Sequence, residues 1–290
     1  MFNQQTRILV TGANGKLGQL VIDSLLKTTS PTQITATVRN AKTSTELSAK
    51  GVRVIEADYA KPETLDKAFA GIDHLLLISS SEVGQRAPQH QNVINAAKRA
   101  GVKLLAYTSI LHVDKSPLGL AEEHLQTEAA IRASGIPFVL LRNSWYTENY
   151  AASAKTAIAR GVFLGAAGHG KIASAARADY AAAAAAVLTS SADQAGRIYE
   201  LAGDEPYTLS QLAAEISRQS GKPVAYENLT EADFKAALIK AGLPEHYAAL
   251  LADSDTGASK GALFDDSHQL GKLIGRPTTP LATVVAEALK

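Results

Sequence analysis

Near its N-terminus the chain carries the sequence Thr11-Gly12-Ala13-Asn14-Gly15-Lys16-Leu17-Gly18. It follows an apolar run that is typical of a buried strand, and it precedes a segment with helical spacing. Glycines at this spacing allow a tight turn, a close approach of a pyrophosphate to the backbone, and close packing of helix and strand. Amides at the helix start then face the phosphates. The stretch predicts a dinucleotide-binding loop, against the alternative of a purely structural turn.

Apolar runs rich in β-branched residues alternate with longer segments of helical spacing through the first half of the chain. This alternation is typical of repeated strand-helix-strand units and a parallel sheet. The expected strands are Arg7 to Thr11, Gln33 to Val38, Val52 to Glu56, His74 to Ile78, Lys103 to Thr108 and Pro137 to Leu141. We therefore predict an α/β protein with a doubly wound parallel sheet of the Rossmann type.

The alternation weakens after about residue 145, where several glycines mark a loop-rich stretch. One further strand, Arg197 to Leu201, is expected to return to the sheet, and the chain from Thr208 onward has mostly helical spacing. We predict an NADP-binding domain over residues 1–145 and a smaller, mostly helical substrate-binding lobe over residues 146–290.

The composition excludes several classes of function. The 29 Lys and Arg against 28 Asp and Glu leave a net charge of +1, which gives no overall field for nucleic acid. The chain has no cysteine, so redox chemistry must come from an organic cofactor, and the histidines show no metal-ligand spacing, so no metal is expected. Without a signal peptide or a long apolar segment, we expect a cytoplasmic protein that does not insert into membranes.

Arg39 indicates which dinucleotide is bound. It stands at the end of the second expected strand, where NAD-binding proteins carry an acidic residue for the ribose hydroxyls. A guanidinium there holds a 2′-phosphate through charge-assisted hydrogen bonds. The sequence predicts NADPH as the cofactor, against the alternative of a solvated arginine.

Polar residues follow the other expected strands at their carboxyl ends, where parallel sheets bind ligands. Serines that merely finish a strand are an equal alternative. The candidate cofactor-binding residues outside the glycine loop and Arg39 are Asp58, Ser79, Ser80, Ser81, Asn143, Ser144, Trp145 and Tyr146, with Lys171 in a later loop.

The chain resembles the NmrA-like atypical short-chain dehydrogenases nearly end to end. Besides the residues above, the resemblance rests on Ser79 to His90, Ser116 to Ala121, Leu141 to Tyr146 and Gly165 to Gly168. Within that family they look like the bacterial NADPH:quinone oxidoreductases of type 2, and the triphenylmethane dye reductases look like the next branch. The resemblance implies reduction of quinones by NADPH without a flavin. It also implies that the nicotinamide lies near Asn143 to Tyr146 and the loop from Gly165 to Ala175.

The chain departs from the Ser, Tyr and Lys arrangement of many short-chain dehydrogenases. Ser109 is suitably placed, but His124 to Glu128 stand where the tyrosine and lysine are expected. We consider His124 as a proton donor, since its ordinary pKa is near neutrality. The alternative is a surface histidine paired with Glu128.

The expected partner is a quinone or a related flat acceptor; a homodimer stays open. Candidate substrate contacts are Gln85, Arg86, Tyr107, Trp145 and Tyr146, although core packing for Trp145 and Tyr146 and a solvated loop for Gln85 and Arg86 are alternatives. Two other functions remain: an NADP(H)-sensing regulator that performs no chemistry, and a dye or azo reductase.

Overall fold

The computed structural model describes residue 3 and residues 5–290, which form two compact units. Unit 1 comprises the described residues up to 113 together with residues 122–143 and 177–199, and unit 2 comprises residues 114–121, 144–176 and 200–290. The predicted division at residue 145 differs from this in three segments. Residues 177–199, of which 197–199 were expected to return to the sheet, belong to unit 1, whereas residues 114–121 and 144–145 belong to unit 2.

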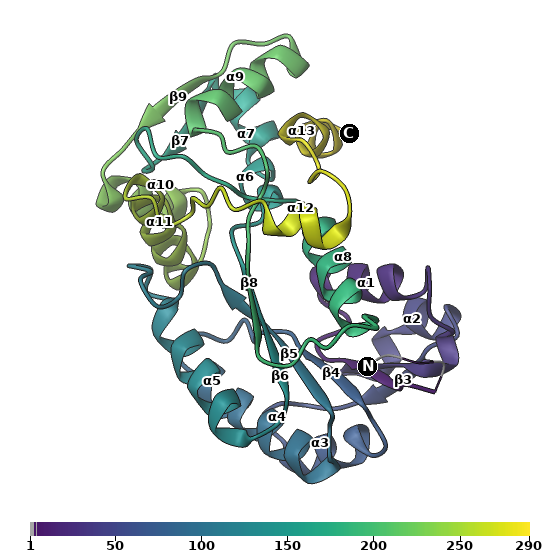
Figure 1. Ribbon diagram of the computed structural model, residues 1–290. Helices are drawn as coiled ribbons and strands as arrows, with labels where there is room; N and C mark the ends of the chain where they lie inside the picture. Colours follow the sequence, from purple (N-terminus) through teal and green to yellow (C-terminus); the bar gives the residue numbers. More distant parts are fainter. Residues whose placement is uncertain (1–2, 4) are drawn as a thin grey trace. The chain divides into compact units, whose positions relative to one another are not determined.

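A sheet of seven strands has the order β3-β2-β1-β4-β5-β6-β8 (Figure 1). The five neighbour pairs from β3 to β6 are all parallel. The strands are β1 (Ile8–Val10), β2 (Ile34–Val38), β3 (Arg53–Glu56), β4 (His74–Leu77), β5 (Leu104–Ile110), β6 (Phe138–Asn143) and β8 (Arg197–Leu201). The order reverses at β1, which makes the carboxyl end of β1 the topological switch point of a Rossmann sheet. The predicted fold class is confirmed.

Helices cover both faces of the sheet in unit 1. Leu75 and Leu77 of β4 belong to a buried cluster with residues of α3 and α4, whereas His74 on the other face of β4 bonds to the carbonyl of Leu188 at the end of α8. The alanine-rich α8 packs against α1, which places residues 177–188 in unit 1. The elements are α1 (Lys16–Leu25), α2 (Thr45–Ala49), α3 (Pro62–Phe69), α4 (Arg86–Ala100), α5 (Ala121–Ser134), α8 (Arg177–Leu188) and the 3₁₀ turns η1 (Pro31–Gln33) and η2 (Ala41–Thr43).

Unit 2 is mostly helical, as predicted, but it also contains a parallel pair of short strands, β7 (Val162–Gly165) and β9 (Ala225–Asn228). These strands are four residues each and β9 is largely exposed, so they leave little hydrophobic pattern in the sequence. The helices are α6 (Thr147–Ala151), α7 (Ala154–Arg160), α9 (Leu209–Ser220), α10 (Glu231–Lys240), α11 (Glu245–Ser259), α12 (Gln269–Ile274) and α13 (Leu281–Leu289). Within the described residues, no helix combines the length and the apolar character needed to cross a membrane.

Candidate functional site

The glycine loop joins the carboxyl end of β1 to the start of α1. Gly12 has a φ of +59°, a left-handed conformation that favours glycine, and Gly15 is the N-cap of α1. A Cβ atom at Gly18 would lie 2.5 Å from the carbonyl oxygen of Gly12 and 2.7 Å from Cα of Ala13. The third glycine therefore lets the helix pack against the loop itself, and a side chain at this position would collide with the backbone.

Backbone hydrogen bonds from both neighbouring strands fix this loop. The amide of Thr11 donates to the carbonyl of Leu76 in β4, and the amide of Ala13 donates to the carbonyl of Thr37 in β2, each at 3.0 Å. The first amides of a helix have no acceptor within the helix, and the helix dipole is positive at that end. The loop is thus held by its neighbours, and its place at a helix start is one that favours an anion.

The predicted loop residues differ in what they can offer a ligand. Gly12, Gly15 and Lys16 are exposed, whereas the side chains of Ala13 and Leu17 are buried. The side-chain amide of Asn14 donates to Oγ of Ser44 at 2.7 Å. Backbone groups and the lysine side chain are therefore the parts of this loop that are accessible to a ligand.

Tyr59 supports the glycine loop through hydrogen bonds, a role that the sequence did not reveal. Its hydroxyl bonds to Oγ1 of Thr11 and donates to the carbonyl of Ile78 at 2.9 Å. Burial raises the pKa of Tyr59, so the hydroxyl stays protonated. The adjacent Asp58 is half-buried, and its Oδ1 accepts from the amide of Ala60 at 2.9 Å, which shapes the turn beside the loop.

Arg39 follows β2 and is largely exposed, with 74% of its side chain accessible. Nη1 of Arg39 lies 2.9 Å from Oε1 of Glu82, in the loop after β4. The guanidinium is therefore at the predicted strand end and accessible to a phosphate, but it carries a carboxylate partner that the sequence did not reveal.

The serines after β4 have distinct surroundings. The amide of Ser79 donates to Oγ1 of Thr108 at 2.8 Å, and the amide of Ser80 donates to Nε2 of His90 at 2.9 Å. Since Nε2 accepts, Nδ1 of His90 carries the proton and donates to Oγ1 of Thr127 at 2.9 Å. Burial lowers the pKa of His90 to about 3, so this imidazole is neutral and orients the loop.

Ser81 and Gln85 are exposed and remain candidate ligand contacts, whereas Arg86 is 5% exposed. Nε of Arg86 donates to the carbonyl of Ser80 at 2.8 Å, and Nη1 lies 3.3 Å from Oε2 of Glu123. The Arg86 guanidinium is therefore occupied by partners within unit 1, which disfavours the expected contact with the substrate.

Tyr107 and His124 lie in the interior of unit 1. Tyr107 is 0% exposed within a hydrophobic cluster, and its hydroxyl is 2.7 Å from Nδ1 of His124, which is 3% exposed. Burial, followed by the charge of Arg86, holds the pKa of His124 well below its usual value. Tyr107 therefore has no surface for a substrate, and the imidazole of His124 is neutral. The alternative prediction, that His124 lies at the surface, is wrong because its side chain is buried.

Ser109 is part of a buried ionic cluster. Its hydroxyl donates to Oε1 of Glu128 at 2.7 Å, and Nη2 of Arg142 lies 2.7 Å from Oε2 of the same carboxylate. The two charges are 3% and 5% exposed and compensate each other. Ser109 lies within β5 rather than after it, and its hydroxyl is hydrogen-bonded within this cluster.

Asn143 and Ser144, at the carboxyl end of β6, each hold a buried polar atom that lacks a hydrogen-bond partner among the described residues. The atoms are Oδ1 of Asn143 and Oγ of Ser144, in side chains that are both 6% exposed. Buried polar groups in proteins are normally satisfied, so these atoms indicate a missing ligand group or water. Both residues were predicted to contact the cofactor.

In unit 2, the segment after Ser144 meets the later glycine-containing loop. Trp145 and Tyr146 are half-buried. The amide of Ala175 donates to the carbonyl of Trp145 at 3.1 Å, and the amide of Thr147 donates to the carbonyl of Ala175 at 3.0 Å. The structure thus brings together the two segments that the family resemblance assigns to the nicotinamide.

Asp255 of α11 anchors the start of that loop, and sequence reasoning missed it. Its Oδ1 accepts from the hydroxyl of Tyr150 at 3.0 Å, and its Oδ2 accepts from the amide of Ala166 at 2.9 Å. A Cβ atom at Gly165 would lie 2.8 Å from Oδ2. Burial raises the pKa of Asp255 to about 6. No local pattern marks this residue, because its partners are about ninety and a hundred residues away.

Lys171 is exposed, and its Nζ lies 5.7 Å from the ring centroid of Phe264 in unit 2. Gly170, just before it, packs against the backbone of Ala258 so closely that a Cβ atom would overlap the carbonyl. The ammonium group is thus carried on a tightly held loop and stays a predicted cofactor contact.

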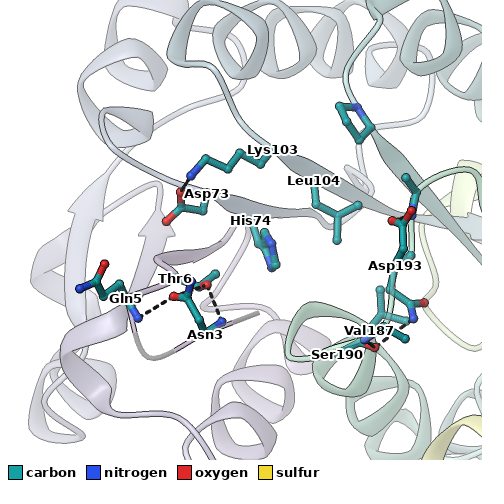
Figure 2. A pocket seen from close by; sticks show the side chains of 14 residues that line it. Asn3, Gln5, Thr6, Asp73, His74, Lys103, Leu104, Val187, Ser190 and Asp193 are labelled. Carbon is teal, nitrogen blue, oxygen red and sulfur yellow. Dashed lines mark hydrogen bonds and ion pairs between the residues drawn. The ribbon is translucent and has the colours of Figure 1, made fainter. Parts of the chain in front are cut away.

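A pocket of about 490 Å³ opens at the amino edge of the sheet in unit 1 (Figure 2). His74 points into it, and the ion pair between Lys103 and Asp73, at 2.8 Å, lies on its wall. Burial lowers the pKa of His74. Because parallel sheets bind ligands at the carboxyl ends of their strands, this pocket is not the dinucleotide site.

The residues at the carboxyl edge fit a dinucleotide on three observations. The glycine loop is held by β2 and β4 and exposes Gly12 and Gly15, Arg39 is accessible at the end of β2, and the end of β6 holds polar atoms without partners. Among the described residues, no group of three His, Asp or Glu is arranged to hold a metal ion.

Comparison with known proteins agrees with this assignment. The sequence model of the NmrA-like family matches residues 4–274. Quinone oxidoreductase 2 of Escherichia coli (strain K12) is 62% identical over 279 residues, which are 96% of this chain and 97% of that protein.

Solved structures show the same relationship. The NADPH-dependent quinone oxidoreductase of E. coli, complexed with NADPH, is 60% identical, with a TM-score of 0.95 over 98% of this chain and all of that chain. The triphenylmethane reductase of Citrobacter sp., complexed with NADP(H), is 40% identical, with a TM-score of 0.93 over 97% of this chain and 99% of that chain.

Proposed function

Because the chain belongs to the NmrA-like family, we propose that it reduces quinones with NADPH in a two-electron step that needs no flavin. The glycine loop carries the proposal. Backbone hydrogen bonds to β2 and β4 hold the loop, and the first amides of α1 are available to bind a diphosphate. The likeness to quinone oxidoreductase 2 over nearly the whole chain supports a quinone as acceptor.

Bound NADPH supplies a hydride, which carries both electrons to the quinone. The product would be an aromatic hydroquinone anion whose charge is delocalised and which takes up one proton from water. Such a reaction depends mainly on positioning, so it needs no charged acid from the protein. This fits the neutral imidazole of His124 and the committed hydroxyl of Ser109.

The chain's own residues then bind and orient the cofactor and the acceptor. The glycine loop and Lys16 hold the diphosphate, Arg39 holds the 2′-phosphate, and Asn143 and Ser144 offer unpartnered polar atoms to the nicotinamide carboxamide. Trp145, Tyr146 and Gln85 remain the proposed acceptor contacts. A cytoplasmic location is part of the same proposal, since the cytoplasm supplies NADPH.

The test is to follow the absorbance of reduced nicotinamide with purified protein, NADPH and benzoquinone, with NADH and a triphenylmethane dye as comparisons. We expect the protein to consume one NADPH per quinone and to react faster with NADPH than with NADH. The purified protein should show no flavin absorption. NADPH that binds but is not consumed with any acceptor would favour the sensing regulator. A faster reaction with the dye than with any quinone would favour the dye reductase.

A further inference from the structure

Arg39, the residue proposed to hold the 2′-phosphate, is already paired with a carboxylate. Its Nη1 lies 2.9 Å from Oε1 of Glu82. Arg39 follows β2 and Glu82 follows β4, and these strands lie on opposite sides of β1 in the sheet. The ion pair therefore spans the carboxyl end of β1, where the glycine loop begins.

Glu82 is held in this position by more than its partner. Its Oε2 accepts from the side-chain amide of Gln89 at 2.7 Å, and its backbone amide donates to Oγ of Ser80 at 3.2 Å. Gln89 belongs to α4, is 8% exposed, and accepts a hydrogen bond from the Ser80 hydroxyl. The carboxylate is thus oriented toward Arg39 by a largely buried side chain.

The pair is nevertheless open to competition. The side chains of Arg39 and Glu82 are 74% and 48% exposed, and ion pairs at such exposure contribute little because water screens them. A phosphate monoester carries more charge and more acceptor oxygens than a carboxylate, and it forms stronger bonds to a guanidinium. A 2′-phosphate can therefore take the place of the carboxylate on Arg39.

We propose that Glu82 is a specificity-determining residue, a carboxylate that occupies Arg39 until the 2′-phosphate of NADPH displaces it. This inference rests on the proposed function, since it concerns the same cofactor. Binding of NADPH must break the pair and overcome repulsion between Glu82 and the phosphate. NADH has no 2′-phosphate, so it leaves the pair intact. Glu82 therefore reduces the preference for NADPH that Arg39 alone would give.

The experiment is a calorimetric titration of the full chain with NADPH, NADH and adenosine 2′,5′-bisphosphate. The variants are Glu82→Gln, Arg39→Ala and the two combined. Glu287→Gln, an equal change of charge at an exposed residue of α13, is the matched control. The removed carboxylate is partly exposed, so the glutamine variant keeps the fold.

We expect Glu82→Gln to tighten NADPH and the bisphosphate by about three- to tenfold, the scale of a partly exposed charge pair, and to change NADH by less than about twofold. The gain should vanish when Arg39 is also alanine. Unchanged or weaker NADPH binding in Glu82→Gln would overturn the inference, as would an equal gain without Arg39 or in Glu287→Gln. If the unmodified chain binds no NADPH, the proposed function fails and this inference fails with it.

Discussion

The hydroxyl of Tyr107 lies 2.7 Å from Nδ1 of His124 inside unit 1, and both side chains are almost completely buried. The imidazole is neutral, because burial holds the pKa of His124 well below its usual value. The contact joins β5 to α5 within the core. We therefore infer a structural role for this pair, in place of the predicted role of His124 as a proton donor.

His124→Gln should lower the free energy of unfolding by about 1–3 kcal/mol, because the Tyr107 hydroxyl is left without a well-placed partner in the interior. NADPH:quinone turnover by the folded variant should stay close to that of the unmodified chain. Chemical denaturation and steady-state kinetics measure the two effects. His246→Gln, at an exposed position of α11, is the control. Loss of turnover with normal stability would restore the catalytic interpretation.

Gly18→Ala and Gly15→Ala should separate folding from binding. The added methyl group at Gly18 meets two backbone atoms at 2.5 and 2.7 Å, so we expect a loss of stability of about 1–3 kcal/mol together with weaker NADPH binding. At Gly15 the nearest atom is the Gly12 oxygen at 3.2 Å, so stability should change less while the methyl group obstructs the diphosphate. Thermal unfolding measures the stability of the two variants, and titration with NADPH measures their cofactor binding. Equal effects of the two variants on both measurements would contradict this account of the loop.

Arg39→Ala should weaken NADPH binding by about 1.5–3 kcal/mol, the scale of a charged hydrogen bond, and should affect NADH little. Arg53→Ala is a matched control, since Arg53 is exposed at the amino end of β3, away from the glycine loop. Dissociation constants for the two cofactors measure the outcome. Equal losses for NADPH and NADH would show that Arg39 does not contact the 2′-phosphate.

Asp255 should give the stability a distinctive pH dependence. Burial raises its pKa in the folded protein from 3.8 to about 6, so the folded state keeps its proton to higher pH than the unfolded state. Its contribution is therefore most favourable below about pH 4 and is lost as the pH rises through about 6. The unfolding free energy of the unmodified chain relative to Asp255→Asn should fall by roughly 3 kcal/mol between about pH 4 and pH 7. A difference that does not vary with pH would contradict the raised pKa.

Local pattern revealed much of unit 1. All seven expected strands are present, because each is a short apolar run between helical segments, although β5 and β6 extend to Ile110 and Asn143. The glycine loop was also predictable, since three glycines at fixed spacing meet a strand and a helix start. The short β7 and β9 were missed, because four residues with partial exposure leave no clear periodicity.

Much of the site depends on contacts between residues far apart in the chain, and these leave no local signal. The sequence shows Arg86 in a polar stretch, whereas in the structure it begins α4 and its guanidinium pairs with Glu123 in α5. Glu82 faces Arg39 only because β2 and β4 flank β1. Charge and residue type suggested candidates, but the sheet order decided which of them are accessible.

The most direct test of the central claim is a calorimetric titration of the purified full chain with NADPH. We propose that the start of α1 and the glycine loop bind the diphosphate, so we expect saturable heat with one NADPH bound per chain. Gly15→Ala should greatly reduce that heat. No heat with any pyridine nucleotide, from a sample shown to be folded, would contradict the assignment of this loop and the function built on it.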